Sequence, residues 1–305
     1  MMVRMQRRFL SVSFPLLPVV GMLLMPTAAR AQSDLDKALE HFDAQTVKGY
    51  IKPMADFFGA NMNAGWYHSA DIPVTGLKIE VNIIGMGSLV GDDQKTFTAT
   101  APPGFSPATF ETATIFGGKG KTIRNSFDTS LTYSGSDGIV DATLFPLAVP
   151  QLTVGSIYGT ELTLRFVPFP DIDAFPKTTY FGVGARHSIS QYLPAVPLDI
   201  AAGVFYTSFE VGDLIDFKGI SIGAQASKTF VIATLYGGLA WENSTMNITY
   251  VSKFPGGGRV DIDLDGDNSF RFTVGAGLSL GFVKLFADAN FGAVTNFSAG
   301  IGVGI

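Results

Sequence analysis

The chain has 305 residues, of which 47% are hydrophobic and only 15% are charged. A soluble globular domain usually has about a quarter of its residues charged, so this composition argues against an ordinary water-exposed surface. The net charge of −5 removes the electrostatic basis for binding nucleic acid. Because the chain has no cysteine, disulfides, cysteine-ligated metals, a thiol nucleophile and a lipid-modified cysteine are excluded.

The first 31 residues have the pattern of a secretory signal peptide. Three arginines among the first eight residues precede an apolar run over residues 9–25, and the small-residue sequence Ala29-Arg30-Ala31 follows. We predict cleavage after Ala31; the alternative is an uncleaved membrane anchor. Cleavage removes four of the 21 basic residues and none of the 26 acidic ones, so the net charge of the exported chain becomes −9.

An amphipathic helix is predicted over residues 33–52. Ser33 and Asp36 form a capping-box pattern, and Pro53 is expected to end the helix. The helix is too short and too charged to span a membrane, so its apolar face must be buried elsewhere. We expect residues 32–56 to form either a plug in the lumen of a barrel or a periplasmic tether. The residues of the plug face are Leu35, Leu39 and Phe42.

From residue 57 onward the chain alternates between apolar and polar residues, which is the period of β-strands. The alternation is clearest over residues 77–83, 161–166, 220–227, 270–280 and 297–305. Weaker strands are predicted over residues 57–68, 122–133, 138–145, 179–189, 198–210, 230–243, 245–252, 259–264 and 283–293. Proline and glycine clusters predict a long irregular loop over residues 91–121.

These patterns predict an all-β protein, a transmembrane antiparallel up-and-down β-barrel that occupies residues 57–305. After the signal peptide no run of about 18 apolar residues exists, and only helices and closed barrels satisfy every backbone hydrogen bond in lipid. We expect about 12 to 14 strands and a location in the outer membrane of a Gram-negative bacterium. The alternative is a secreted β-sandwich, but the polar face here is mainly glycine and serine and carries few charges.

Several charged residues fall on the predicted inward faces, where charge is tolerated because lipid is absent. They would either form buried ion pairs that fill a narrow barrel or line a path for solutes, and the pairing interpretation is favoured. These lumen-lining candidates are Glu80, Arg165, Arg186, Arg271, Lys284 and Asp288. Aromatic residues near predicted strand ends are expected to form interfacial girdles, namely Trp66, Tyr67, Tyr180, Tyr206, Tyr236, Trp241 and Tyr250.

An acidic stretch is similar to the start of an EF-hand calcium loop. Its carboxylates are Asp261, Asp263, Asp265 and Asp267. Position twelve of such a loop should be a bidentate glutamate, but it is Phe272 here, so we favour a strand that leads into an exposed turn without metal. A weak surface calcium site is the alternative.

Two His-Ser pairs occur, at residues 68–69 and 187–188, and could suggest hydrolysis. Adjacent residues of a strand point to opposite faces, so neither pair can act as base and nucleophile without residues from other strands. We therefore predict that the protein is not an enzyme, with no catalytic residue and no cofactor.

Four stretches resemble an uncharacterised family of outer-membrane barrels known only as a domain of unknown function. They are GWYHSA at residues 65–70, YGTELTLR at 158–165, GVGARHSISQYLP at 182–194 and SKTF at 227–230. More distantly, a helix followed by a barrel is similar to the long-chain fatty-acid channel family, which pairs a helical plug with 14 strands. This chain lacks the Asn-Pro-Ala plug motif of those channels, and it is much shorter.

The leading functional prediction is a passive outer-membrane channel or transporter for small solutes, including hydrophobic ones. The alternatives are a structural or adhesive barrel without transport and, third, an outer-membrane lipid-modifying enzyme. The expected partners are outer-membrane lipid, the barrel-insertion machinery and a hydrophobic small-molecule solute.

Overall fold

The structure is a computed structural model that describes residues 44–167, 177–193, 195–251 and 258–305. The predicted signal peptide, residues 1–31, lies outside these residues, as do Leu35, Leu39 and Phe42. The helical elements are α2 (Ala44–Met62), η1 (Asp92–Gln94) and η2 (Ser190–Tyr192). The strands are β1 (Lys78–Leu89), β2 (Thr96–Thr100), β3 (Phe105–Ser106), β4 (Thr109–Ala113), β5 (Thr122–Asn125), β6 (Thr132–Ser134), β7 (Leu144–Ile157), β8 (Thr160–Val167), β9 (Thr178–Ser188), β10 (Asp199–Val211), β11 (Ile215–Phe230), β12 (Ala233–Val251), β13 (Arg259–Asp265), β14 (Phe270–Leu280), β15 (Val283–Phe291) and β16 (Asn296–Gly304).

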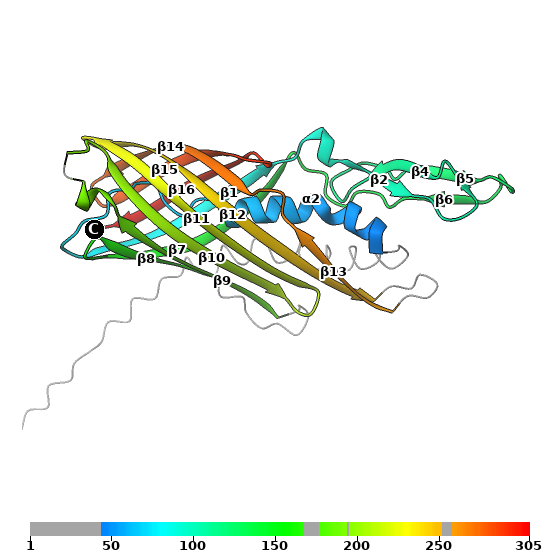
Figure 1. Ribbon diagram of the computed structural model, residues 1–305, viewed down its shortest axis with the longest axis horizontal. Helices are drawn as coiled ribbons and strands as arrows, with labels where there is room; N and C mark the ends of the chain where they lie inside the picture. The colour runs from blue at the N-terminus through cyan, green and yellow to red at the C-terminus, as the bar shows by residue number, and fades with distance from the viewer. Residues whose placement is uncertain (1–43, 168–176, 194, 252–257) are drawn as a thin grey trace, which may run out of the picture.

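Ten of the described strands close into an antiparallel barrel (Figure 1). Around the ring the order is β1, β7, β8, β9, β10, β11, β12, β14, β15 and β16. The ring is complete because β16 pairs with β1 and β11 pairs with β12. The prediction of an all-β antiparallel barrel is confirmed, and the predicted count of 12 to 14 strands is wrong.

The count was too high because several predicted strands do not belong to the barrel wall. Residues 57–68 belong to α2 and to the segment after it, and the strands within residues 122–133 lie outside the barrel. Among the described strands, β13 pairs only with the C-terminal part of β12, from Thr245 to Val251, and extends beyond the ring. The two strands predicted over residues 230–252 form one long strand, β12.

The two faces of the wall follow the predicted alternation. In β14, the side chains of Phe272 and Val274 point outward and are each 49% exposed, while Arg271 and Thr273, which alternate with them, are buried inside. In β8, Leu162 and Leu164 point outward in the same way. Along these strands the outer face is therefore apolar and the inner face polar, as expected for a barrel surrounded by lipid.

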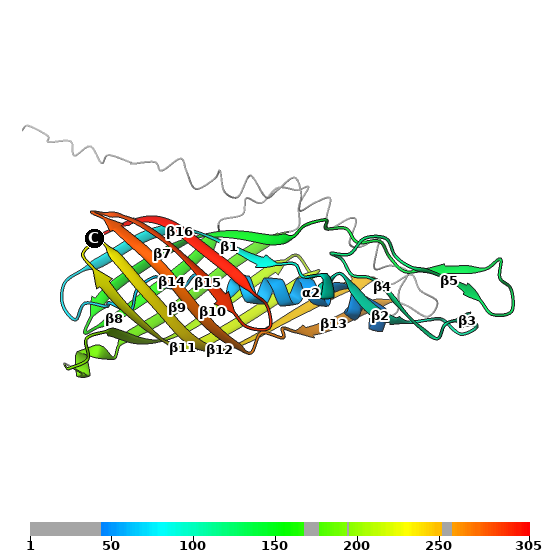
Figure 2. The ribbon, with the colours of Figure 1, turned by 90° about the horizontal axis from the view of Figure 1, so that it is seen from above.

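The two ends of the barrel differ in their connections (Figures 1 and 2). At one end, which we call the turn end, short turns join β7 to β8, β11 to β12 and β14 to β15, and the chain finishes at Ile305. At the other end, the loop end, the long connection from β1 to β7 and the β12–β13 extension project away from the wall.

The connection from β1 to β7 forms an arm, residues 90–143, that projects from the loop end (Figure 2). Strand β2 pairs with β4, and β5 pairs with both β3 and β6, around a small core of Ala99, Phe110 and Ile123. Residues 91–121 are thus not an irregular loop. Near the tip, the Ser130 hydroxyl and backbone N–H donate to the Asp128 carboxylate and hold the pKa of Asp128 below its usual value.

Helix α2 begins at the loop end and runs into the barrel (Figures 1 and 2). It continues through Pro53 to Met62, so the predicted end at Pro53 is wrong. Proline costs about 3 kcal/mol in a helix interior. Burial of Ile51 and Phe57, which are both fully buried, offsets this cost, because each large apolar side chain contributes about 1.5–3 kcal/mol.

No helix of the described residues has both the length and the apolar character needed to cross a membrane.

After α2 the chain runs through the lumen, residues 63–77, to the turn end, where β1 begins. Ser227 of β11 accepts a hydrogen bond from the Ala70 backbone N–H at 2.9 Å. We call residues 44–77, the helix and the part that follows it, the lumen segment. The first barrel strand therefore begins at Lys78, not near residue 57.

Candidate functional site

The loop-end half of the lumen is filled by apolar side chains around α2. The ring of Phe57 lies 4.9 Å from that of Phe116, and the ring of Phe58 lies 5.0 Å from that of Phe217. Phe57 and Phe217 have no exposed surface. This half is packed like the core of a soluble domain.

Polar side chains fill the rest of the lumen, and three arginines of the wall hold the lumen segment by its backbone. Arg165 of β8 donates from Nη2 to the carbonyl of Ala64 at 2.9 Å and from Nη1 to the carbonyl of Met62 at 3.3 Å. Its guanidinium carbon lies 3.8 Å from the centre of the Trp66 ring, a cation–π contact. Arg165 is fully buried, and among the described residues no carboxylate pairs with it.

Arg271 of β14 makes the second attachment. It forms a bidentate pair with Glu242 of β12, at 2.6 and 3.0 Å, and donates to the Ala60 carbonyl at 2.7 Å. The last turn of a helix leaves its backbone carbonyls without partners inside the helix. A cation at this end also interacts favourably with the negative end of the helix dipole. Arg271 and Arg165 therefore cap α2 from opposite parts of the wall.

Arg186 of β9 makes the third attachment. Its Nε donates to Glu161 of β8 at 2.8 Å, and its Nη1 donates to the carbonyl of Ser69 at 2.6 Å. Lys78, the first residue of β1, also donates to Glu161 at 2.8 Å. The carboxylate is thus shared by two cations, one of which holds the lumen segment near the turn end.

Glu80 and Asp288 lie inside the barrel, and no arginine of the described residues pairs with either of them. His68 Nε2 lies 3.2 Å from Glu80, whose carboxylate also accepts from Asn82 at 2.8 Å. Asp288 accepts from the hydroxyl of Tyr236 at 2.9 Å and from Asn290 at 2.6 Å. Hydrogen bonds to the wall and to the lumen segment thus surround both carboxylates.

Lys284 is the sixth candidate and lies apart from these contacts. It donates to Ser279 at 3.2 Å, and it lines a cavity of about 350 Å³ at the turn end together with His68, Lys78 and Glu80. This cavity is the free space between the end of the lumen segment and the wall. The structure thus brings five of the six predicted charges into contacts that pack or hold the interior and leaves Lys284 at the mouth.

The carboxylates of the calcium candidate are spread along a strand. Asp261, Asp263 and Asp265 accept hydrogen bonds from Thr249, Asn247 and Thr245 of β12. Asp267 pairs with Lys52 of α2 at 2.7 Å. Within the described ranges no group of three or more acidic, histidine or cysteine side chains could hold a metal ion.

The two histidines of the His-Ser pairs have separate surroundings. His187 Nδ1 lies 2.8 Å from the Thr160 hydroxyl, and its Nε2 contacts Tyr192 and Gln191 at 3.0 and 2.8 Å. The ring of His68 stacks on Phe286 inside the barrel. Among the described residues, neither histidine contacts both a serine and an acid.

Most of the predicted girdle residues are not at the membrane surface. Tyr206 and Trp241 point outward, at 37% and 44% exposure. Trp66 and Tyr67 belong to the lumen segment, and Tyr180, Tyr236 and Tyr250 point inward and are buried. A girdle role for these five is wrong, because they fill the space around the lumen segment.

Sequence reasoning missed Glu161, Glu242 and Asn61. The signal for Glu161 was present, since it alternates with Leu162 on an inward face and stands directly opposite Arg186 in the β8–β9 register. Asn61 carried no such signal. It lies in α2, fully buried, and accepts from Ser88 and Asn296 at 2.8 and 2.6 Å.

These features define a class of protein: an antiparallel β-barrel whose interior is occupied by its own N-terminal segment. The chain belongs to a family of unknown function, DUF6588, whose profile matches residues 5–305. This agrees with the resemblance to an uncharacterised family. A search of curated proteins finds no significant match.

Solved structures that the chain is similar to are barrels with low sequence identity. A loop L8 deletion of OmpT, an outer membrane protein of Vibrio cholerae, is 12% identical with a TM-score of 0.28, over 75% of this chain and 98% of that one. OmpF of Salmonella typhi in complex with daunomycin is 10% identical with a TM-score of 0.25, over 75% and 97%. At such TM-scores the likeness carries no argument about function, and it does not single out the fatty-acid channels.

Proposed function

We propose that this protein is a passive outer-membrane channel for small solutes that its lumen segment holds closed. The observation that carries the proposal is the way in which the wall holds this segment. Arg165, Arg186 and Arg271 donate hydrogen bonds to its backbone carbonyls, so the segment is attached by groups that water can replace.

Two arginine–glutamate pairs of the wall would stay intact if the segment moved. Arg186 would remain paired with Glu161, and Arg271 with Glu242, because both ion pairs join strands of the wall. A barrel with a purely structural role has no need of these charges, since well-packed apolar residues often replace buried ion pairs without loss of stability. The polar wall therefore favours water-soluble solutes over hydrophobic ones.

The width of the barrel agrees with this proposal. Barrels of eight strands are just wide enough for side chains to fill, and those of 16 leave an aqueous channel. Ten strands enclose room for one helix or one extended chain. Withdrawal of the lumen segment would thus open a path of about that width.

A structural barrel without transport remains the second candidate. The apolar packing of Phe57 and Phe58 against Phe116, Phe145 and Phe217 favours it, because this half would have to come apart for a path to open. We assign no catalytic role to any residue. Outer-membrane lipid around the apolar exterior and the barrel-insertion machinery are the partners that this function requires.

A disulfide between α2 and the wall tests the channel. A Cβ placed on Gly59 would lie 3.1 Å from the Cβ of Ser244 of β12, close to the 3.5–4.5 Å of a disulfide. The native chain has no cysteine, so Gly59→Cys/Ser244→Cys forms one defined bond. In planar bilayers, we expect the oxidised double variant to open rarely and a reductant to restore openings.

The single variants are the controls and should not respond to the reductant. Equal conductance of the oxidised and reduced double variant, with the crosslink verified on gels, would disprove gating by α2. If neither the native protein nor the reduced variant conducts at all, the structural barrel is supported instead.

A further inference from the structure

The turn end carries a ring of exposed apolar side chains, which we call the apolar rim. It is formed by Ile157, Tyr158, Val231, Ile232, Phe282 and Ile305. Val231 is 98% exposed, Tyr158 81% and Phe282 69%. Four of these residues lie in the turns, Ile157 is the last residue of β7, and Ile305 follows β16.

Two turn positions of the rim carry residues that are unusual for their backbone conformation. Tyr158 and Val231 have positive φ angles of 50° and 57°, a conformation usually taken by Gly, Asn or Asp. A β-branched valine is unusual there, and its side chain touches little of the protein. The side chain must therefore find its apolar contacts outside the chain.

The loop end has exposed charges at its tips as well as exposed apolar side chains such as Phe127 and Val251. Its β10–β11 turn contains the exposed Asp213, and the β12–β13 extension carries Arg259 and Asp261 on its exposed face. The tips of the three short turns at the turn end are thus apolar, whereas the tips at the loop end combine charged and apolar residues.

The lengths of the strands explain why the rim lies where it does. A strand of about 9–11 residues tilted by about 45° crosses the hydrocarbon layer. β14 has 11 residues, and β15 and β16 have nine each. The outward side chains of β14 are apolar from Phe270 to Leu280. The whole strand is therefore required to cross the hydrocarbon layer, and the layer extends to the turn at Phe282.

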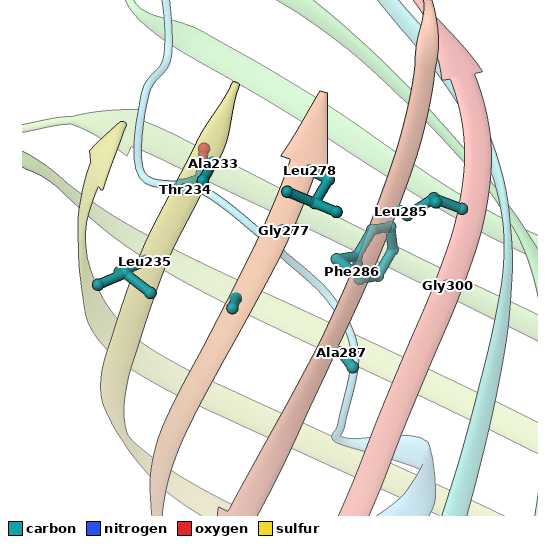
Figure 3. A pocket seen from close by; sticks show the side chains of 10 residues that line it. Ala233, Thr234, Leu235, Gly277, Leu278, Leu285, Phe286, Ala287 and Gly300 are labelled. Carbon is teal, nitrogen blue, oxygen red and sulfur yellow. The ribbon is translucent and has the colours of Figure 1, made fainter. Parts of the chain in front are cut away.

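The apolar wall is continuous with the rim. A groove of about 540 Å³ lies on the outer wall across β12, β14, β15 and β16, and its outward side chains include Leu235, Leu278 and Leu285 (Figure 3). Leu278 and Leu285 are paired across β14 and β15, next to the turn that carries Phe282. The groove and the rim therefore form one surface.

The apolar rim surrounds a polar mouth, and this arrangement favours lipid over a protein as the partner. Inside the ring the mouth is polar, lined by Lys78, Glu80 and Lys284. A protein that covered the end of the barrel would meet both parts, whereas lipid around the barrel meets only the outer, apolar part.

We propose that the apolar rim is a membrane-contact surface and that the turns of this end lie in the lipid interface, not in water. The proposal rests on the barrel crossing a membrane, which belongs to the proposed function, and does not depend on conduction. Val231 and Phe282 are the anchors at the β11–β12 and β14–β15 turns.

Single cysteines in this cysteine-free chain test the rim. The variants are Val231→Cys and Phe282→Cys in the rim, Val274→Cys on the wall and Asp213→Cys at the loop end. Each is placed in nanodiscs of dimyristoylphosphatidylcholine, in which both faces of the bilayer meet the buffer, and treated with a charged maleimide. Because the reagent needs a thiolate in water, we expect the rim and wall variants to react about tenfold more slowly than Asp213→Cys.

In denaturant all four variants should react at the same rate, which shows that the differences come from the fold. Fast reaction at the rim with a protected wall would overturn the proposal while the barrel still crosses the membrane. Fast reaction at both would show that the barrel itself does not. A rim that is reactive in nanodiscs but protected in native membranes would assign it to a protein partner and overturn the lipid assignment.

Discussion

The interior of this protein depends on buried charges whose partners come from different parts of the chain. Arg271 is satisfied by Glu242, Asn296 and the Ala60 carbonyl, and the pair Glu242–Arg271 is almost fully buried. Removing one member of such a pair leaves an uncompensated charge in a region of low dielectric constant, which costs far more than the net value of the pair.

We therefore expect Glu242→Gln to lower the free energy of unfolding by about 3–5 kcal/mol. The matched control is Glu210→Gln on β10, where the side chain is exposed and the same isosteric change should have little effect. The measurement is the denaturant midpoint of unfolding in detergent micelles, with the gel mobility of the folded barrel as the probe of unfolding. Equal midpoints of the two variants would show that Glu242 does not stabilise the native state.

At the scale of single elements, burial overrides local preference. Pro53 lies inside α2 because the residues around it are enclosed by the wall and the arm. Residues 57–68, the end of α2 and the segment after it, alternate weakly and were predicted as a strand. The wall strands show the opposite case, since their alternation alone places the side chains on the correct face.

The outward face of β14 should not tolerate a charged side chain. Val274→Arg, at the middle of the strand and on its outward face, should lower stability by about 2–4 kcal/mol because it places a charge near the bilayer midplane. Asp213→Arg at the loop end should be nearly neutral. Midpoints of unfolding from lipid bilayers measure both changes, and a tolerant Val274→Arg would mean that this face does not meet lipid.

At the scale of the whole molecule, the lumen segment passes through the barrel from one end to the other. Lys48 is exposed at the loop end, and Asp71 is exposed at the turn end. Short turns of bacterial barrels face the periplasm and long loops face outward. By this rule, we expect the start of α2 to lie on the outer side of the membrane.

Labelling of intact cells tests the direction of threading. Lys48→Cys should react with a maleimide attached to a large polyethylene glycol chain that does not cross the outer membrane. Asp71→Cys should react only after the membrane is disrupted. The reverse pattern would place the turn end outside and would invert the topology.

The sequence by itself determined the barrel class, the faces of the strands and which charges point inward, as at Glu80 and Arg165. These follow from alternation, which is a local property of an extended chain. It did not determine the strand count, the path of the lumen segment or the partners of the arginines. Those depend on closure of the ring and on the register between strands distant in the chain, so only the tertiary structure decided them, including the pairing of Glu242 with Arg271.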